Sequence, residues 1–163
     1  SDYYALILAK RMSRKEFDFR LLPGVGAGAC GPIVSQLLGR GETFAILLDD
    51  DKAGKKEAQR YTDEWFLASH LVCTIGTVNA KFAGYQIEGL LDEETRTLIK
   101  ERLDVPTLTK RQIGLYLAEG AAAANLTDKY LSEKSAEQLI EILEYFQNIL
   151  IPLSLGADAV VAV

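Results

Sequence analysis

Apolar residues change their spacing several times along the first 75 positions, and each change marks a predicted element. Apolar side chains three or four positions apart predict helices, whereas alternation or an unbroken apolar run predicts a strand. The predicted helices cover residues 3–12, 30–40 and 54–69, and the predicted strands cover residues 17–22, 44–48 and 71–75. The run 44–48 is apolar throughout, as expected of a strand buried on both faces of a parallel sheet. The alternating order indicates an α/β fold with crossover helices.

The second half of the chain is helical in pattern. After an irregular stretch with an extended piece at 85–87, Asp92 is a predicted cap for a helix over 93–103. Two capping-box patterns follow, each with its helix. They are Thr109-x-x-Gln112, opening a helix over about 110–124, and Ser135-x-x-Gln138, opening one that runs to about Leu150 before Pro152. The apolar tail 153–163 either packs on the domain or continues into further sequence.

Composition narrows the class of protein. The 163 residues are 48% hydrophobic and 25% charged, which fits one ordinary globular domain, with or without a small appendage. No apolar run approaches the roughly 20 residues of a membrane span. A net charge of −5 excludes a uniformly basic nucleic-acid coat, and one His excludes a His-rich metal site. Cys30 and Cys73 are expected to be reduced and buried. With no signal peptide at its start, the protein is expected to be cytoplasmic.

Positive charge is concentrated near the start of the chain. Residues 1–40 hold six basic and three acidic residues, a local charge of 6 − 3 = +3. Five of the basic residues could face a phosphate backbone or could simply form a solvated helix end and turn. They are Lys10, Arg11, Arg14, Lys15 and Arg20.

The most informative motif is Asp49-Asp50-Asp51, which follows the apolar run 44–48 and precedes a helix. Ligands of open α/β sheets bind at the carboxyl ends of the strands. Side chains alternate along an extended segment, so Asp49 and Asp51 point one way and Asp50 the other. Converging carboxylates repel each other unless a cation lies between them, and Mg²⁺ favours such oxygen ligands. Gly54 lets the chain turn tightly into the helix. The alternative hypothesis is helix capping alone.

Other candidate residues carry weaker signals. Gly24-x-Gly26-x-Gly28 fits a dinucleotide fingerprint only loosely, and we interpret it as a tight turn that lets the backbone approach the site. Glu88 follows a short extended piece, and Lys110 lies in the first turn of a predicted helix. Each of these two is either a functional group or an ordinary surface charge.

The motif Asp49-x-Asp51-x-x-Gly54 resembles the Asp-x-Asp-x-x-Gly of Toprim domains, which are found in topoisomerases, bacterial primases and several nucleases. Pro23-Gly24 falls at the family's glycine turn. The start of the chain, Ser1 to Leu6, resembles the segment after the opening Glu of the OLD family (overcoming lysogenization defect). That likeness nominates Asp2 as an acidic ligand, Glu88 within 87–91 as a further carboxylate, and Lys110 as the family's lysine.

The resemblance implies a Toprim-like parallel sheet in a catalytic domain over 1–115, with its first strand upstream, and a helical extension over 116–163. It implies a DNA endonuclease in which Asp2, Asp49, Asp51 and Glu88 hold two Mg²⁺ or Mn²⁺ ions. Asp49, Asp51, Glu88 and Lys110 would be catalytic. The expected partners are DNA, an ABC-type ATPase domain upstream in the same polypeptide, and a second copy in a homodimer.

Two rival hypotheses stay open from the sequence. One is another Toprim chemistry, that of a topoisomerase or a primase. The other is a non-enzymatic α/β module whose acidic cluster senses metal or accepts a phosphate. If the nuclease hypothesis holds, the chain without the family's opening Glu is expected to cleave weakly or not at all.

Overall fold

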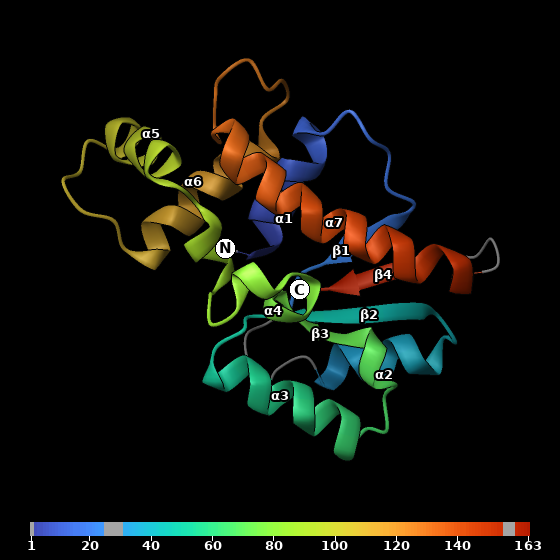
Figure 1. Ribbon diagram of the computed structural model, residues 1–163. Coiled ribbons are helices and arrows are strands. Elements are labelled where there is room, and N and C mark those ends of the chain that lie inside the picture. Colours follow the sequence, from blue (N-terminus) through green and yellow to red (C-terminus); the bar gives the residue numbers. More distant parts are fainter. Residues whose placement is uncertain (1, 25–30, 155–158) are drawn as a thin grey trace. The chain divides into compact units, whose positions relative to one another are not determined.

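The computed structural model describes residues 2–24, 31–154 and 159–163, with the side chains of 153 and 154 left aside. The predicted α/β class is confirmed (Figure 1). The α-helices are α1 (Asp2–Met12), α2 (Gly31–Gly39), α3 (Lys52–Asp63), α4 (Ile75–Val78), α5 (Glu93–Leu103), α6 (Lys110–Ala122) and α7 (Glu133–Ser154). The 3₁₀ turns are η1 (Ser69–Leu71), η2 (Ala80–Phe82) and η3 (Ile87–Leu90). The strands are β1 (Phe19–Leu22), β2 (Thr43–Leu48), β3 (Val72–Thr74) and β4 (Ala159–Ala162).

The strands pair in the order β1-β4-β2-β3, and every pairing is parallel. β4 comes from the apolar tail and lies between β1 and β2, with Phe19 and Thr43 both opposite Ala159. All four residues of β4 are buried, which suits a central strand covered on both faces. The sequence analysis left open whether the apolar tail packs on the domain or continues into further sequence. In the structure, residues 159–162 of this tail form a central strand of the sheet.

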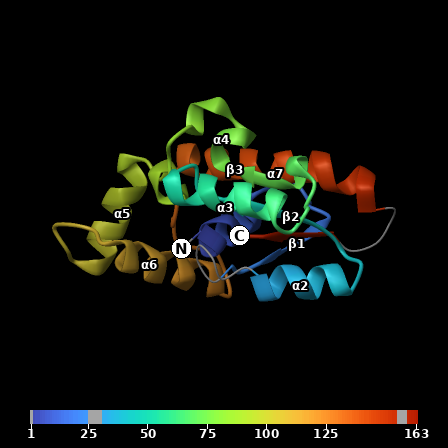
Figure 2. The same cartoon turned by 90° about the horizontal axis from the view of Figure 1, so that it is seen from below.

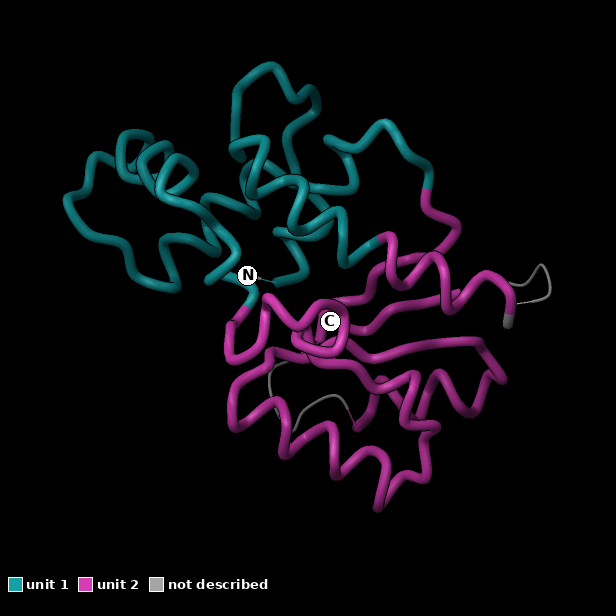
Figure 3. Tube along the Cα trace, in the orientation of Figure 1, with its two compact units in different colours: residues 1–16, 87–143 teal, residues 17–86, 144–163 magenta. Residues whose placement is uncertain are grey.

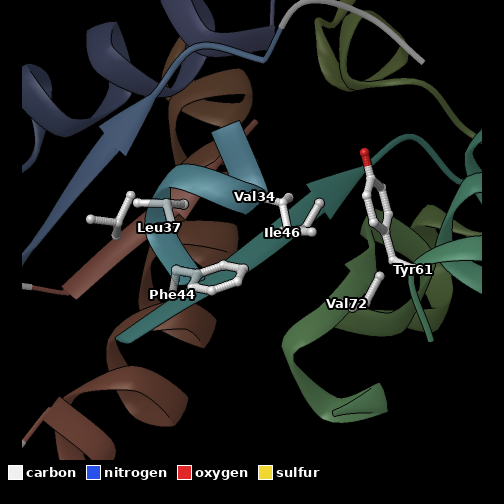
Figure 4. Packing of buried hydrophobic residues seen from close by; sticks show 7 residues of the cluster. Val34, Leu37, Phe44, Ile46, Tyr61 and Val72 are labelled. Carbon is white, nitrogen blue, oxygen red and sulfur yellow. The ribbon is translucent and has the colours of Figure 1, made fainter. Parts of the chain in front are cut away.

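Helices cover both faces of this sheet (Figures 1 and 2). On one face, Val34 and Leu37 of α2 and Tyr61 of α3 pack against Phe44, Ile46, Val72 and Val160 of the strands (Figure 4). On the other face, the Sγ of Cys73 in β3 lies 3.9 Å from the hydroxyl of Tyr145 in α7. The backbone N–H of Asp18, just before β1, donates to the side chain of Gln147 in the same helix at 2.8 Å. The strands are therefore buried between two layers of helices, and this packing fixes the position of the loops at the carboxyl end of the sheet.

The chain divides into two compact units, coloured separately in Figure 3. Unit 1 comprises residues 1–16 and 87–143, and unit 2 comprises residues 17–86 and 144–163. Unit 2 contains the sheet, α2, α3 and the second half of α7. The division at residue 115 that the resemblance implied coincides with none of the three borders between these units, and 116–163 contributes residues to both.

Unit 1 is helical and is held together by polar contacts as well as apolar ones. The guanidinium of Arg11 in α1 donates to the last carbonyls of α6, at 3.1 Å to Gly120 O and 2.8 Å to Ala121 O. Asp92 caps α5, and its Oδ1 also accepts from the hydroxyls of Ser132 and Ser135 at 2.8 and 3.0 Å. These bonds fasten the start of α5 to the start of α7.

Several element boundaries differ from the predicted ones. The caps at Asp92 and at Thr109 with Gln112 are confirmed. The cap predicted at Ser135 is wrong, because α7 already begins at Glu133 and the N–H of Ser135 donates to the hydroxyl of Ser132 at 3.0 Å. The helix also continues through Pro152. In place of the extended piece predicted over 85–87, η3 begins at Ile87.

The helix predicted over 54–69 is too long at its C-terminal end. α3 ends at Asp63, and Phe66 has a φ of 54° and is 87% exposed. Two aromatic residues at helical spacing, Trp65 and Phe66, extended the predicted pattern beyond the real end.

Predictions on the glycine turn at 25–29 and on Cys30 lie outside the described residues. Cys73 is free and fully buried, as predicted. In the part of the chain that the structure describes, no helix combines the length and the hydropathy needed to cross a membrane.

Candidate functional site at the carboxyl end of the sheet

The three aspartates connect β2 to α3 at the carboxyl end of the parallel sheet (Figure 1). β2 ends at Leu48, and the cap of α3 is Asp51. Asp50 is 5% exposed, while its neighbours Asp49 and Asp51 are only half-buried. Burial therefore differs between adjacent positions, as an extended connection dictates.

Asp50 ties the ends of two strands together. Its carboxylate accepts from the hydroxyl of Thr74 at the end of β3, and from the N–H of Gly84 at 2.7 Å. The Nζ of Lys55 in α3 lies 3.0 Å from the same carboxylate. Burial raises the pKa of Asp50, but these hydrogen bonds and the lysine outweigh it and hold that pKa below its ordinary value. Asp50 is a charged structural anchor.

Close packing around Asp50 explains a glycine that the sequence analysis overlooked. A Cβ added at Gly76, in α4, would lie 2.5 Å from Cγ of Asp50. The N–H of Asp50 also donates to the carbonyl of Tyr85 at 2.9 Å. The chain after β3 is thus wrapped closely around this one carboxylate.

Asp51 performs the capping role that the alternative hypothesis assigned to it. Its Oδ1 accepts from the N–H of Gly54 at 2.8 Å, and its Oδ2 accepts from the side-chain amide of Gln86 at 2.8 Å. A carboxylate has about four lone-pair positions, so these two hydrogen bonds do not by themselves exclude a metal ligand role. Capping and metal binding are therefore compatible at this residue.

Gly54 supplies the close approach that the motif requires. A Cβ at this position would lie 2.0 Å from the carbonyl oxygen of Asp49, closer than any real Cβ contact. Only glycine lets the first turn of α3 fold against the end of β2 in this way. The motif Asp49-x-Asp51-x-x-Gly54 is thus one locally packed unit.

The remaining predicted site residues belong to unit 1, whereas Asp49 and Asp51 belong to unit 2. Asp2 lies in the first turn of α1, which contacts η3, the element that holds Glu88. Glu88 is 9% exposed, and its carbonyl accepts from the guanidinium of Arg96 at 2.8 Å. Lys110 is exposed at the first position of α6, directly after the Thr109 cap.

The donor chemistry at Asp49 and Asp51 fits a hard divalent cation, because Mg²⁺ typically takes one or two protein carboxylates and completes its shell with water and phosphate oxygens. Across residues 2–24, 31–154 and 159–163, no three His, Cys, Asp or Glu side chains gather into a group that could hold a metal ion. The carboxylates of Asp49 and Asp51 are therefore suitable ligands for one cation. The larger set of four carboxylates stays a prediction.

Two of the basic residues once considered for phosphate contact have structural partners instead. Arg11 caps α6, and Arg20 lies 3.5 Å from the carboxylate of Glu42. Exposed lysines that the sequence analysis did not single out occur at the start of α3, beside an open cavity of about 530 Å³.

Sequence reasoning missed Asp50 as an anchor and Gln86 as the partner of Asp51. Gln86 lies 35 positions after Asp51, and nothing in its local pattern marks it. Asp50 stands inside the motif, where its burial could have been inferred from the alternation.

No protein-family model, curated protein or solved structure matches this chain.

Proposed function

We propose that this chain is a metal-dependent DNA endonuclease of Toprim type, resembling the nuclease half of OLD-family proteins. The observation that carries the proposal is the arrangement at the end of β2. Asp49 and Asp51 follow a buried strand of a parallel sheet, and Gly54 packs so closely on Asp49 that no side chain fits there. Ligands of open α/β sheets bind at such a position, and a hard cation held there can promote phosphodiester hydrolysis.

Asp49 and Asp51 would hold a divalent cation, and that cation would supply Lewis-acid polarisation of the scissile phosphate when bound. The N–H of Gly54 and the amide of Gln86 keep the Asp51 carboxylate in one orientation. The ion pair of Asp50 with Lys55 removes one negative charge from the neighbourhood of the phosphate. Asp2 and Glu88 stay the predicted ligands of a second ion, and Lys110 the predicted stabiliser of phosphoryl charge.

The test compares Asp49→Asn and Asp51→Asn with wild type in plasmid nicking with Mg²⁺ or Mn²⁺, and in calorimetric Mn²⁺ titration. Asparagine keeps the size of aspartate, and at position 51 it remains a good helix cap. We expect both variants to lose Mn²⁺ binding, together with any nicking that the wild-type chain shows, while they keep the wild-type melting temperature. Asp104→Asn, an exposed change directly after α5, is the matched control.

Two results would overturn the proposal. One is wild-type nicking by both variants. The other is absence of both nicking and Mn²⁺ binding in the wild-type chain. Product analysis separates the rivals, because a topoisomerase yields relaxed closed circles and a primase yields RNA primers. Mn²⁺ binding without DNA turnover would favour the regulatory module.

A further inference from the structure

An open cavity in unit 2 has Asp50 among its lining residues. Its volume is about 530 Å³, within the range of sites that bind small organic groups. α3, η1 and α4 form its walls, and Asp50 lies at its edge. Polar side chains on these walls are Lys55, Gln59, Thr62, Ser69 and Thr77. The only charged pair among its lining residues, Lys55 with Asp50, neutralises itself.

Positive charge borders this cavity along α3. Lys52, Lys55 and Lys56 fall within the first five residues of the helix and are exposed, and Lys55 and Lys56 follow Lys52 by three and four positions. Among the described residues, Lys52 and Lys56 have no ion-pair partner. The first turn of α3 contains no acidic residue. The carboxylates directly before the helix are already engaged, because Asp51 caps α3 and Asp50 pairs with Lys55.

The row of lysines extends beyond the cavity, because Lys52 and Lys56 are not among its lining residues. A ligand that used both features would have to be longer than the cavity and would have to carry several separated negative charges. A polynucleotide strand meets both conditions, whereas a free nucleotide or a single phosphate meets neither. The chain is acidic overall, at −5, so this basic row is a local feature of α3.

We propose that the cavity and the lysine row (Lys52, Lys55 and Lys56) form the binding site for a nucleic-acid strand. Phosphates of the strand contact the lysines, and one nucleotide enters the cavity against Gln59 and Ser69. This inference rests on the proposed function, since it gives a nucleic-acid strand a site along α3, the helix that begins directly after Asp51. It also holds for a protein that binds nucleic acid without cutting it.

The experiment measures binding of a fluorescein-labelled single-stranded oligonucleotide by anisotropy, with EDTA present and over a series of salt concentrations. The variants are the double change Lys52→Gln with Lys56→Gln, and the single change Gln59→Glu, which places a negative charge in the cavity wall. Lys55 is left in place because it holds Asp50. The double variant is expected to bind about tenfold more weakly at 0.1 M salt and to lower the salt slope by about 1.4. Gln59→Glu is expected to weaken binding severalfold.

Two matched controls carry the same changes of charge elsewhere. Lys100→Gln with Lys134→Gln removes two lysines of unit 1, and Gln36→Glu adds a charge on the exposed surface of α2. Neither is expected to change binding by more than about twofold. All variants are expected to melt like wild type except Gln59→Glu, which should melt slightly lower because Gln59 donates to Asp63 at 2.7 Å. Equal losses in variants and controls, or wild-type binding by the double variant, would overturn the proposal. Competition by inorganic phosphate or a mononucleotide as strong as that by the strand would also overturn it.

The two proposals fail in different ways. If nicking and Mn²⁺ binding are both absent but strand binding still depends on Lys52 and Lys56, only the nuclease proposal fails. If nicking depends on Asp49 and Asp51 but the lysine variants bind like wild type, only the strand-binding site fails.

Discussion

The side-chain amide of Gln86 donates a hydrogen bond to Oδ2 of Asp51 at 2.8 Å. This bond links the segment after η2 to the first turn of α3. Oδ1 of the same carboxylate is held by the N–H of Gly54 at 2.8 Å. Both oxygens of Asp51 are thereby fixed by donors from different parts of unit 2, and the carboxylate is oriented before any ligand arrives.

Replacing Gln86 should weaken metal binding without unfolding the protein. In Gln86→Ala, Asp51 keeps its capping bond but loses the donor that orients Oδ2. Loss of a partner that orients a metal ligand typically costs about tenfold or more in affinity. Calorimetric Mn²⁺ titration checks this, with Gln138→Ala in α7 as the control. Equal affinities for wild type, variant and control would show that Gln86 does not position Asp51.

Adding a methyl group at Gly54 should destabilise the fold, whereas the same change at Gly39 should stabilise it. The new Cβ in Gly54→Ala would lie 2.0 Å from backbone atom O of Asp49, and backbone cannot move aside cheaply. We expect a loss of about 1 to 3 kcal/mol. Gly39, in α2, has nothing within 4 Å of its added Cβ, and Gly39→Ala should gain about 0.5 to 1 kcal/mol. Urea unfolding of both variants measures these differences, and a neutral Gly54→Ala would contradict the packing argument.

Asp92 should make folding stability depend on pH in the acid range. Burial raises the pKa of Asp92, but hydrogen bonds from the N–H of Thr95 and from the hydroxyls of Ser132 and Ser135 outweigh it, so the folded pKa is lowered. A lowered folded pKa gives stabilisation that is present above the unfolded pKa of about 3.9 and is lost as pH falls through the folded value.

The stability difference between wild type and Asp92→Ala should therefore be about 2 kcal/mol above pH ~5 and should shrink below pH ~4. Urea unfolding across this pH range measures the difference. Glu93→Ala, an exposed change at the next position, should leave the pH profile as in wild type. A difference that stayed constant down to the lowest pH would rule out the charge of Asp92 as its source.

Cys73 should resist alkylation in the folded protein. Burial raises the pKa of its thiol, and the hydrogen bond with Tyr145 offsets this only in part. The thiolate is the reactive form, so a buried thiol with a raised pKa reacts slowly at neutral pH. Mass spectrometry of the Cys73 peptide after iodoacetamide treatment should show little modification in buffer and full modification in urea. Equal rates in both conditions would contradict the burial of this residue.

Local sequence patterns predicted most of the helices and strands, but they missed β4 and misplaced the end of α3. The run 44–48 and the caps at Asp92 and Thr109 act over a few positions, and each was found where predicted. β4 was missed because four small apolar residues in an apolar tail show no period, and their strand exists only through pairing with β1 and β2. The end of α3 was misplaced because Phe66 is apolar in type but exposed in the fold.

By itself, the sequence determined the α/β class, the position of the acidic turn after a buried strand, and the need for a glycine at 54. These properties follow from residue types and spacings within short stretches of the chain, so they can be inferred without the tertiary structure. Only the tertiary structure decided that Asp50 is an anchor for Thr74, that Gln86 holds Asp51, and that the tail enters the middle of the sheet. The two side-chain contacts join residues 24 and 35 positions apart, and packing of the whole unit, rather than local preference, brings such residues together.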